Sequence, residues 1–285
     1  MKRFRFIAVV LGVVLFSFFI IFILQDEKSV MTHPEGVIAK GQLDAISWQY
    51  LLMLIVVVPT FLFLMLIFWK QSRKKKKKYD PEKTFGWKGE VLLWLFPLCV
   101  VIVMTYITWD SSHKLDPYRP IGDKKPLVIQ VVALDWKWLF IYPEQGIATI
   151  NYIQIPEKEP VHFLLAADGS PMNSFWIPQL SGQIYAMSGM ITQLHILANK
   201  TGVYTGRAAE INGAGFADML FTVKSTEMKE FEEWIDKVKG SSNALTESAY
   251  EELLKPSQNH PVVLYSSVDK DLFHKIVMKY MNPSQ

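Results

Sequence analysis

The sequence contains a single cysteine, Cys99, among its 285 residues. A disulfide within the chain is therefore excluded, and the compartment has to be inferred from topology rather than from redox chemistry. The sequence also lacks a Gly-rich phosphate loop, a nucleophile elbow and a constellation of paired carboxylates. These are the motifs that carry phosphate binding, nucleophilic attack and acid–base catalysis. We therefore do not expect the isolated chain to be catalytic.

Histidines are few, and no two of them show the i, i+4 spacing of metal ligands on a helix. The six are His33, His113, His162, His195, His260 and His274. Two of them, His162 and His195, fall within expected strands, where an imidazole bonded to its neighbours is the common arrangement. We expect none of the six to bind a metal.

The net charge of the chain is only +3, and its basic excess comes largely from residues 73–78, which read Arg-Lys-Lys-Lys-Lys-Lys. In a soluble protein such a run predicts nucleic-acid binding or nuclear targeting. Next to a membrane span it predicts a cytoplasmic anchor. The sequence shows no accompanying aromatic residues and no fold that would bind in a nucleic-acid groove, so we expect no nucleic-acid partner.

Two long stretches carry no charged residue, at residues 47–69 and 91–109. Each is close to the ~20 residues that a helix needs to cross the hydrocarbon core of a bilayer. Aromatic residues at the ends of the first stretch, Trp48 and Trp69, stand where aromatic belts form. A buried hairpin in a soluble protein is the alternative, and the lysine run between the two stretches argues against it. The pattern predicts a transmembrane hairpin over residues 25–110.

The positive-inside rule orients this hairpin. The loop at residues 70–90 holds the lysines and is expected in the cytoplasm, which puts the large C-terminal part outside, in the periplasm or its equivalent. Residues 1–24 combine basic residues with an apolar run, and form either a signal peptide or a retained anchor helix. No Ala-x-Ala cleavage site follows, which favours retention, and a retained segment gives three spans with consistent alternation.

Beyond a polar linker, residues 111–225 have the pattern of a β domain. Short β-rich segments separated by Pro, Gly or Asn predict a sandwich or a barrel. These segments are residues 127–134, 136–142, 147–155, 161–166, 192–198 and 219–223.

Residues 226–285 have a helical pattern and form a C-terminal extension. We expect Thr226 to cap a first helix whose first turn holds Glu227 and Glu230, an arrangement that suits the helix dipole. Two further helices are expected near residues 246–254 and 269–281.

Residues 202–219 read Gly-Val-Tyr-Thr-Gly-Arg-Ala-Ala-Glu-Ile-Asn-Gly-Ala-Gly-Phe-Ala-Asp-Met. This stretch resembles the copper loop of subunit II of the haem-copper respiratory oxidases. In the cytochrome c oxidase form of that loop, two Cys, a Glu, a His and a Met surround a dinuclear copper centre, and a second His lies upstream. At the two Cys and two His positions this sequence has Ala208, Asn212, Phe216 and Asn173. The Glu and Met positions keep Glu210 and Met219.

A dinuclear copper centre needs bridging thiolates and imidazoles, and Cys99 lies far from the loop in the sequence. We therefore expect no metal or other cofactor on this chain. A loop that keeps the surrounding sequence pattern but lacks these ligands resembles that of subunit II of the cytochrome bo-type quinol oxidases. The resemblance extends from about residue 41 onward, and its most specific block is Asp-Trp-Lys-Trp-Leu-Phe-Ile-Tyr-Pro-Glu-Gln-Gly-Ile at residues 135–147.

The resemblance implies a cupredoxin-like Greek-key sandwich behind the membrane hairpin. It further implies a complex that oxidises ubiquinol, reduces oxygen to water and pumps protons, with the haems, the catalytic copper and the quinol pocket in subunit I. The expected partners are subunit I, smaller membrane subunits and membrane lipid. Two alternatives stay open: a cytochrome c oxidase subunit II with a rebuilt copper site, and a stand-alone, membrane-tethered cupredoxin-like binding or assembly protein.

Two further features have a structural and a functional interpretation. Glu90 begins the second span, where a carboxylate favours the helix N-terminus by about 0.3–1 kcal/mol. In the oxidase family a Glu at the start of this helix lies at the mouth of a proton-uptake path, so Glu90 is also a candidate for proton entry.

The aromatic residues of 135–142 lie near the electron-entry surface of the copper-containing relatives. Without copper, we expect them to pack the sandwich against the membrane subunits.

Overall fold

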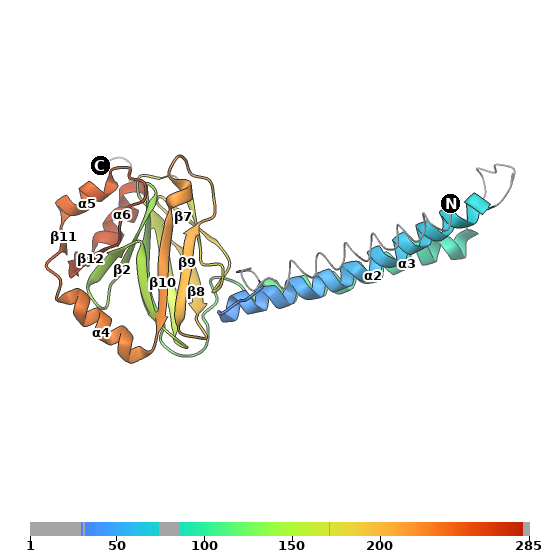
Figure 1. Cartoon of the computed structure of the whole chain (residues 1–285), viewed down its shortest axis with the longest axis horizontal. Coiled ribbons are helices and arrows are strands. Elements are labelled where there is room, and N and C mark those ends of the chain that lie inside the picture. Colours follow the sequence, from blue (N-terminus) through green and yellow to red (C-terminus); the bar gives the residue numbers. More distant parts are fainter. Residues whose placement is uncertain (1–29, 31, 74–85, 171, 282–285) are drawn as a thin grey trace. The chain divides into compact units, whose positions relative to one another are not determined.

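A computed structural model of the chain describes residues 30, 32–73, 86–170 and 172–281 (Figure 1). These residues form two compact units. One unit is Gly41–Asp116, and the other contains Pro117 onward together with the segment up to Lys40. Residues 1–24, 74–85 and 282–285, on which part of the topology prediction rests, lie outside the described residues.

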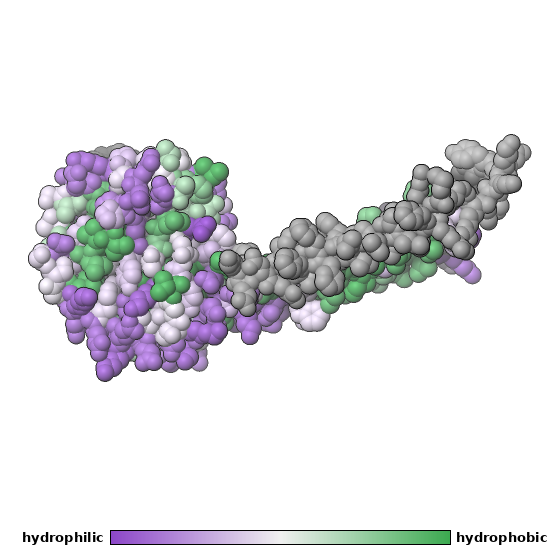
Figure 2. Space-filling model, in the orientation of Figure 1, coloured by the Kyte–Doolittle hydropathy of each residue, from purple (hydrophilic) through white to green (hydrophobic). Residues whose placement is uncertain are grey.

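The smaller unit is a pair of helices, α2 (Val37–Arg73) and α3 (Gly86–Lys114). Both are long and apolar enough to cross a membrane. At 1.5 Å per residue, α2 is about 55 Å long, which exceeds the ~30 Å hydrocarbon core of a bilayer. Apolar side chains line the middle of the visible part of the helices (Figure 2), and most large apolar side chains of both helices are exposed. The two helices are joined by a side-chain hydrogen bond of 3.3 Å from Gln49 Nε2 to Thr108 Oγ1.

The larger unit is a two-layer β-sandwich. One sheet has the order β12-β3-β2-β1-β5-β8 and the other the order β4-β10-β9-β6-β7. Neighbouring strands are mostly antiparallel, but β1 pairs with β5 and β4 pairs with β10 in parallel, because the chain crosses between the sheets. The strands of the first sheet are β1 (Leu127–Leu134), β2 (Lys137–Tyr142), β3 (Ile147–Ile150), β5 (Pro160–Ala167), β8 (Thr192–Leu197) and β12 (Val263–Tyr265). Those of the second are β4 (Tyr152–Pro156), β6 (Met172–Trp176), β7 (Ile184–Met187), β9 (Gly202–Ala208) and β10 (Leu220–Thr226).

Aromatic side chains fill the space between the two sheets. Trp138, Phe140 and Tyr142 point inward from alternate positions of β2 and are fully buried. Opposite them, the rings of Phe175 and Phe221 stack with their centroids 5.0 Å apart. The expectation that these aromatic residues pack against membrane subunits is therefore wrong, because they form the core of their own domain.

A second core lies on the outer face of the six-stranded sheet, and the C-terminal extension covers it (orange to red in Figure 1). The extension contains α4 (Met228–Lys239), α5 (Glu247–Leu254) and α6 (Leu272–Met281), together with β12 and the short pair β11 (Ala244–Leu245) and β13 (Ser267–Val268). From the sheet, this core takes Val132, Leu134, Leu139, Ile141, Ala148, Ile150 and Ala166. Strand β2 is consequently buried on both faces.

Two buried polar side chains of the sheet also hold the extension. Lys137 is 1% exposed, and its Nζ donates to the carbonyl oxygen of Lys255 at 2.7 Å and to Ser257 Oγ at 2.6 Å. Its pKa is lowered, because burial disfavours the ammonium more than the nearby Asp135 carboxylate favours it. Asn151 donates from Nδ2 to the carbonyl oxygen of His260 at 2.8 Å.

Several boundaries differ from the sequence prediction. The expected strand 147–155 is two strands, β3 and β4, because Asn151 has a φ of 54° and lets the chain pass from one sheet to the other. Strands β6, β7 and β9 were not predicted. The expected cap at Thr226 is wrong: Thr226 ends β10, and Glu227 is the N-cap of α4 without a side-chain hydrogen bond. Helices α5 and α6 confirm the expected helices, but the extension is not purely helical.

Candidate functional site

The sequence stretch that resembles a copper loop lies at one end of the sandwich. Four turns meet there, at residues 135–136, 168–170, 188–191 and 209–219, and we call this region the loop end. The frame of the last turn is fixed by backbone hydrogen bonds from Ala208 N to Met219 O at 3.1 Å and from Ala209 N to Ser174 O at 2.9 Å. These bonds place the turn beside the start of β6, which carries Asn173.

Three of the sequence-predicted site residues meet inside the loop end. Asn212 Nδ2 donates to Asn173 Oδ1 through a short hydrogen bond and to Met219 Sδ at 3.1 Å. Asn173 and Met219 are both 0% exposed, and Ala208 lies buried at the end of β9. The amide pair is incompletely satisfied, because Asn173 Nδ2 and Asn212 Oδ1 have no hydrogen-bond partner among the described residues. A side-chain amide pair thus cross-links the turn to β6.

Trp136, which was not among the predicted site residues, packs against the turn at residues 209–219. It occupies the two-residue turn between β1 and β2 with a φ of 60°, and its Nε1 donates to the Asn212 carbonyl oxygen at 3.4 Å. A Cβ on Gly215 would lie 2.4 Å from Trp136 Cγ, so only glycine lets the indole approach the turn this closely. The Trp-Lys-Trp motif was visible in the sequence, but its contact with the turn was not.

Two other predicted residues stand apart from this cluster. Phe216 lies in a short 3₁₀ turn (η1, Phe216–Asp218) and is half-buried against the main core. Glu210 is half-buried, and among the described residues it forms no hydrogen bond or ion pair. The loop end therefore gathers two amides, a thioether and an indole, and the carboxylate is not part of the cluster.

These donors do not fit a dinuclear copper centre. Such a centre requires thiolates that bridge the two metals and imidazoles that complete their coordination. At the loop end, Ala208 and Phe216 offer no donor atom, while the Asn173 and Asn212 amides are neutral and bonded to each other. Among the described residues there is no group of three or more His, Cys, Asp and Glu side chains able to hold a metal ion.

The two strand histidines lie together on the side of β5 and β8 that faces away from the main core, with His195 buried and His162 half-buried. The rings of His162 and His195 stack with centroids 4.1 Å apart. His195 Nδ1 lies 3.0 Å from the Pro117 carbonyl oxygen, and His162 Nε2 lies 3.1 Å from Gln193 Oε1. Burial, and then the neighbouring imidazole, lower the pKa of His162. Both rings therefore have bonded structural positions.

Glu90 belongs to the helical unit and lies on the exposed surface of α3. The helix begins at Gly86, and its first turn contains no acidic residue. The dipole interpretation of Glu90 is therefore wrong, because the effect of the dipole fades beyond the first turn. Among the described residues, the Glu90 carboxylate forms no hydrogen bond or ion pair.

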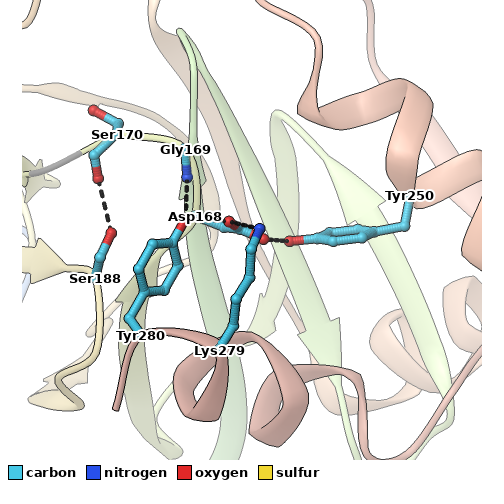
Figure 3. Close-up of polar contacts among 7 residues, drawn as sticks. All are labelled: Asp168, Gly169, Ser170, Ser188, Tyr250, Lys279 and Tyr280. Carbon is cyan, nitrogen blue, oxygen red and sulfur yellow. Dashed lines mark hydrogen bonds and ion pairs between the residues drawn. The ribbon is translucent and has the colours of Figure 1, made fainter. Parts of the chain in front are cut away.

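A second polar cluster at the loop end was not predicted from the sequence. Asp168, which follows β5, is 1% exposed and accepts hydrogen bonds from Tyr250, Lys279 and Tyr280 of the extension (Figure 3). In the sequence, an aspartate followed by a glycine after a strand predicts only an ordinary turn. Its partners lie more than eighty residues away along the chain, so no local pattern reveals them.

Two family models match the larger unit. Residues 144–226 match the family described as cytochrome c oxidase subunit II, periplasmic domain, and residues 239–284 match the COX aromatic rich motif. The crystal structure of the periplasmic domain of subunit II of cytochrome oxidase from Bradyrhizobium japonicum is similar at 22% identity. It covers 41% of this chain and 96% of that one, with a TM-score of 0.39. The helices, the sandwich and the family models together define a haem-copper oxidase subunit II with a cupredoxin-like domain.

Curated relatives narrow the class. The chain is 50% identical over 203 residues to cytochrome bo(3) ubiquinol oxidase subunit 2 of Pseudomonas putida, a match that covers 71% of this chain and 64% of the relative. The match to the corresponding protein of Pseudomonas aeruginosa covers 61% of that relative's length. The subunit 2 of Buchnera aphidicola subsp. Schizaphis graminum is 38% identical over 262 residues, which is 90% of each chain. The chain belongs to the family of subunit 2 of the cytochrome bo(3)-type ubiquinol oxidases.

Proposed function

We propose that this chain is the redox-silent subunit II of a proton-pumping ubiquinol:oxygen oxidoreductase. The observation that carries the proposal is the hydrogen-bonded Asn173–Asn212 amide pair. By the resemblance to the copper loop, both residues occupy positions that hold metal ligands in the cytochrome c oxidase form. Ala208, Asn212, Phe216 and Asn173 are then lost ligand positions. Electrons from a donor dissolved in the bilayer need no periplasmic relay. The loop end therefore takes no part in electron transfer.

The proposal assigns a task to each part of the chain. Residues 25–110 form a hairpin whose spans brace subunit I, with the loop 70–90 in the cytoplasm of a bacterium. The cupredoxin-like domain, residues 111–225, and the extension, residues 226–285, cap the periplasmic face. Haems, catalytic copper and the ubiquinol pocket belong to subunit I, and the smaller membrane subunits complete the complex.

Glu90 is proposed as the proton-entry group of this subunit. Its support is its location: it is an exposed carboxylate directly before the uncharged run of residues 91–109, in a helix that is long enough to cross a membrane. Ionisable groups of membrane-spanning helices that face a neighbouring helix or a water-filled cavity commonly mark ion paths.

The test is oxygen uptake by the complex purified through a tag on this chain. A short-chain ubiquinol and reduced cytochrome c are compared as electron donors at concentrations that supply the same number of electrons. Uptake with ubiquinol alone supports the proposal. Uptake with cytochrome c requires an electron-entry site that the proposal lacks. No uptake with either donor, in a preparation without haem, favours the stand-alone binding protein instead.

A further inference from the structure

The second polar cluster at the loop end joins three parts of the chain at one carboxylate. Asp168 Oδ2 accepts from the Tyr250 hydroxyl at 2.7 Å, and Oδ1 accepts from Lys279 Nζ at 2.8 Å and from the Tyr280 hydroxyl at 2.6 Å (Figure 3). Tyr250 comes from α5, and Lys279 and Tyr280 come from the last turn of α6. Both carboxylate oxygens are therefore occupied by the extension.

Charge makes this contact stronger than an ordinary surface pair. Burial alone raises the pKa of Asp168, but the hydrogen bonds from Lys279, Tyr280 and Tyr250 together outweigh it and lower the pKa. Hydrogen bonds with an ionised partner are roughly twice as strong as neutral ones. Other charged groups near the cluster are Asp135, which lies close to Gly169, and Glu247, Glu251, Asp269 and Lys275, which line the adjoining cavity.

Tyr280 differs from Tyr250 in one respect, because it also holds the backbone of the turns. The Gly169 N–H donates to the Tyr280 hydroxyl at 3.0 Å. A Cβ built on Gly189, whose φ is +71°, would lie 3.1 Å from Tyr280 Cβ, so this side chain also packs on the turn between β7 and β8. Ser188 Oγ donates to the Ser170 carbonyl oxygen at 3.1 Å and ties the two turns to each other.

The turn that Tyr280 holds leads directly into β6 and Asn173. Asp168–Ser170 follow β5, and Met172–Trp176 form β6. The extension therefore holds the chain at Gly169, four residues before Asn173 in the sequence. In contrast, Tyr250 reaches only the Asp168 carboxylate, and its other contacts lie in the second core.

We propose that Tyr280, seated on Asp168, is a positioning residue through which the C-terminal extension holds the two turns and the start of β6 at the loop end. The aromatic-rich motif then has a specific task in this chain: it supplies the cross-links that keep the metal-free loop end ordered. This proposal concerns the fold of the chain and does not depend on the electron donor of the complex.

The chain offers a matched pair of variants, Tyr280→Phe and Tyr250→Phe. Each removes one hydroxyl from the same carboxylate and keeps the ring, but only the first also removes the acceptor of the Gly169 N–H. Hydrogen–deuterium exchange is measured by mass spectrometry on the full chain in the purified complex. The informative peptides cover residues 164–176 and 184–194, and a peptide over α4 is the internal reference.

Exchange in both informative peptides is expected to rise about tenfold in Tyr280→Phe, the upper end of the effect of one hydrogen bond, because this variant loses the Gly169 bond in addition to the bond to Asp168. In Tyr250→Phe it is expected to stay within about twofold of the unmodified chain, because Asp168 keeps its bonds to Lys279 and Tyr280 and the Gly169 N–H keeps its acceptor. Lys279→Met is a second test, since it weakens the carboxylate contact but keeps the Gly169 bond, and it is expected to give a smaller rise than Tyr280→Phe.

Equal exchange in the two tyrosine variants would overturn the proposal, because the cluster would then only attach the extension to the sheet. A rise in Tyr280→Phe that is confined to the α6 peptide would also overturn it. If Tyr280→Phe lowers the yield of the complex, Lys279→Met alone decides: no rise in either informative peptide contradicts the positioning role.

Discussion

The amide pair at the loop end gives a quantitative prediction. In Asn212→Leu, the side chain keeps a similar shape but loses its hydrogen bonds to Asn173 Oδ1 and Met219 Sδ. Asn173 is fully buried, so its carbonyl oxygen is left without a partner or water. An orphaned buried polar group of this kind costs ~1–3 kcal/mol. We expect a loss of about 2 kcal/mol in the free energy of unfolding, at the middle of that range.

The double variant Asn173→Leu/Asn212→Leu removes both amides at once. It also removes the two atoms that already lack partners, Asn173 Nδ2 and Asn212 Oδ1. Replacement of both partners by apolar groups of similar shape is close to neutral, so we expect the double variant to regain stability and to lie within about 1 kcal/mol of the unmodified chain. The two substitutions are therefore strongly non-additive.

The assay is thermal unfolding of the full chain in detergent, followed by tryptophan fluorescence. For a unit of this size, about 2 kcal/mol corresponds to a fall in Tm of about 4–8 °C. Asn243→Leu, at an exposed asparagine of the extension, is the control and is expected to change stability by no more than about 0.5 kcal/mol. Additive effects of the two loop-end substitutions would show that the amides are not paired, and the description of the site would be wrong.

Three further predictions concern other parts of the chain. Truncation after Lys239 exposes the outer face of the six-stranded sheet, at about 1.5–3 kcal/mol for each large apolar side chain, and is expected to yield an aggregated chain by size-exclusion chromatography. Glu90→Gln is expected to lower turnover and proton pumping in the purified complex without changing the Tm, whereas unchanged pumping would remove Glu90 from the proton path. The pKa of Asp168 is lowered from 3.8, so its stabilising contribution is present above that pH and is lost only as the pH falls below it. Asp168→Asn is therefore expected to lower the Tm at pH 7, and a difference that vanishes already at pH 6 would contradict the assigned contacts.

Much of the fold could be predicted from the sequence, because it depends on local patterns. Two uncharged runs of membrane length predicted α2 and α3, and β-rich segments predicted β1, β2, β5 and β8. The missed strands β6, β7 and β9 carry polar and glycine residues within motifs that resemble loops. Gly206 illustrates the difficulty: glycine normally weakens a strand, but here a Cβ would lie 2.0 Å from Phe221 Cζ, so the core requires it.

The candidate site was predictable in its members but not in its contacts. The resemblance to the copper loop identified Asn173, Asn212 and Met219, and the structure brings these three together. The roles of Trp136 and Asp168 depend on the register of the strands and on an extension distant in sequence, and neither leaves a local signal. The same holds for Lys137, since a lysine within an aromatic motif gives no sign of the carbonyl oxygen that it binds.

The central claim is that this chain carries no copper centre, and metal analysis of the complex tests it most directly. The complex is purified through a tag on this chain, its copper is quantified against haem, and electron paramagnetic resonance is recorded on the oxidised form. We predict no signal from a dinuclear copper centre, and spectra that are unchanged by Asn212→Leu. A dinuclear copper signal that disappears in Asn212→Leu or Met219→Leu would contradict the account, because the loop end would then be a metal site.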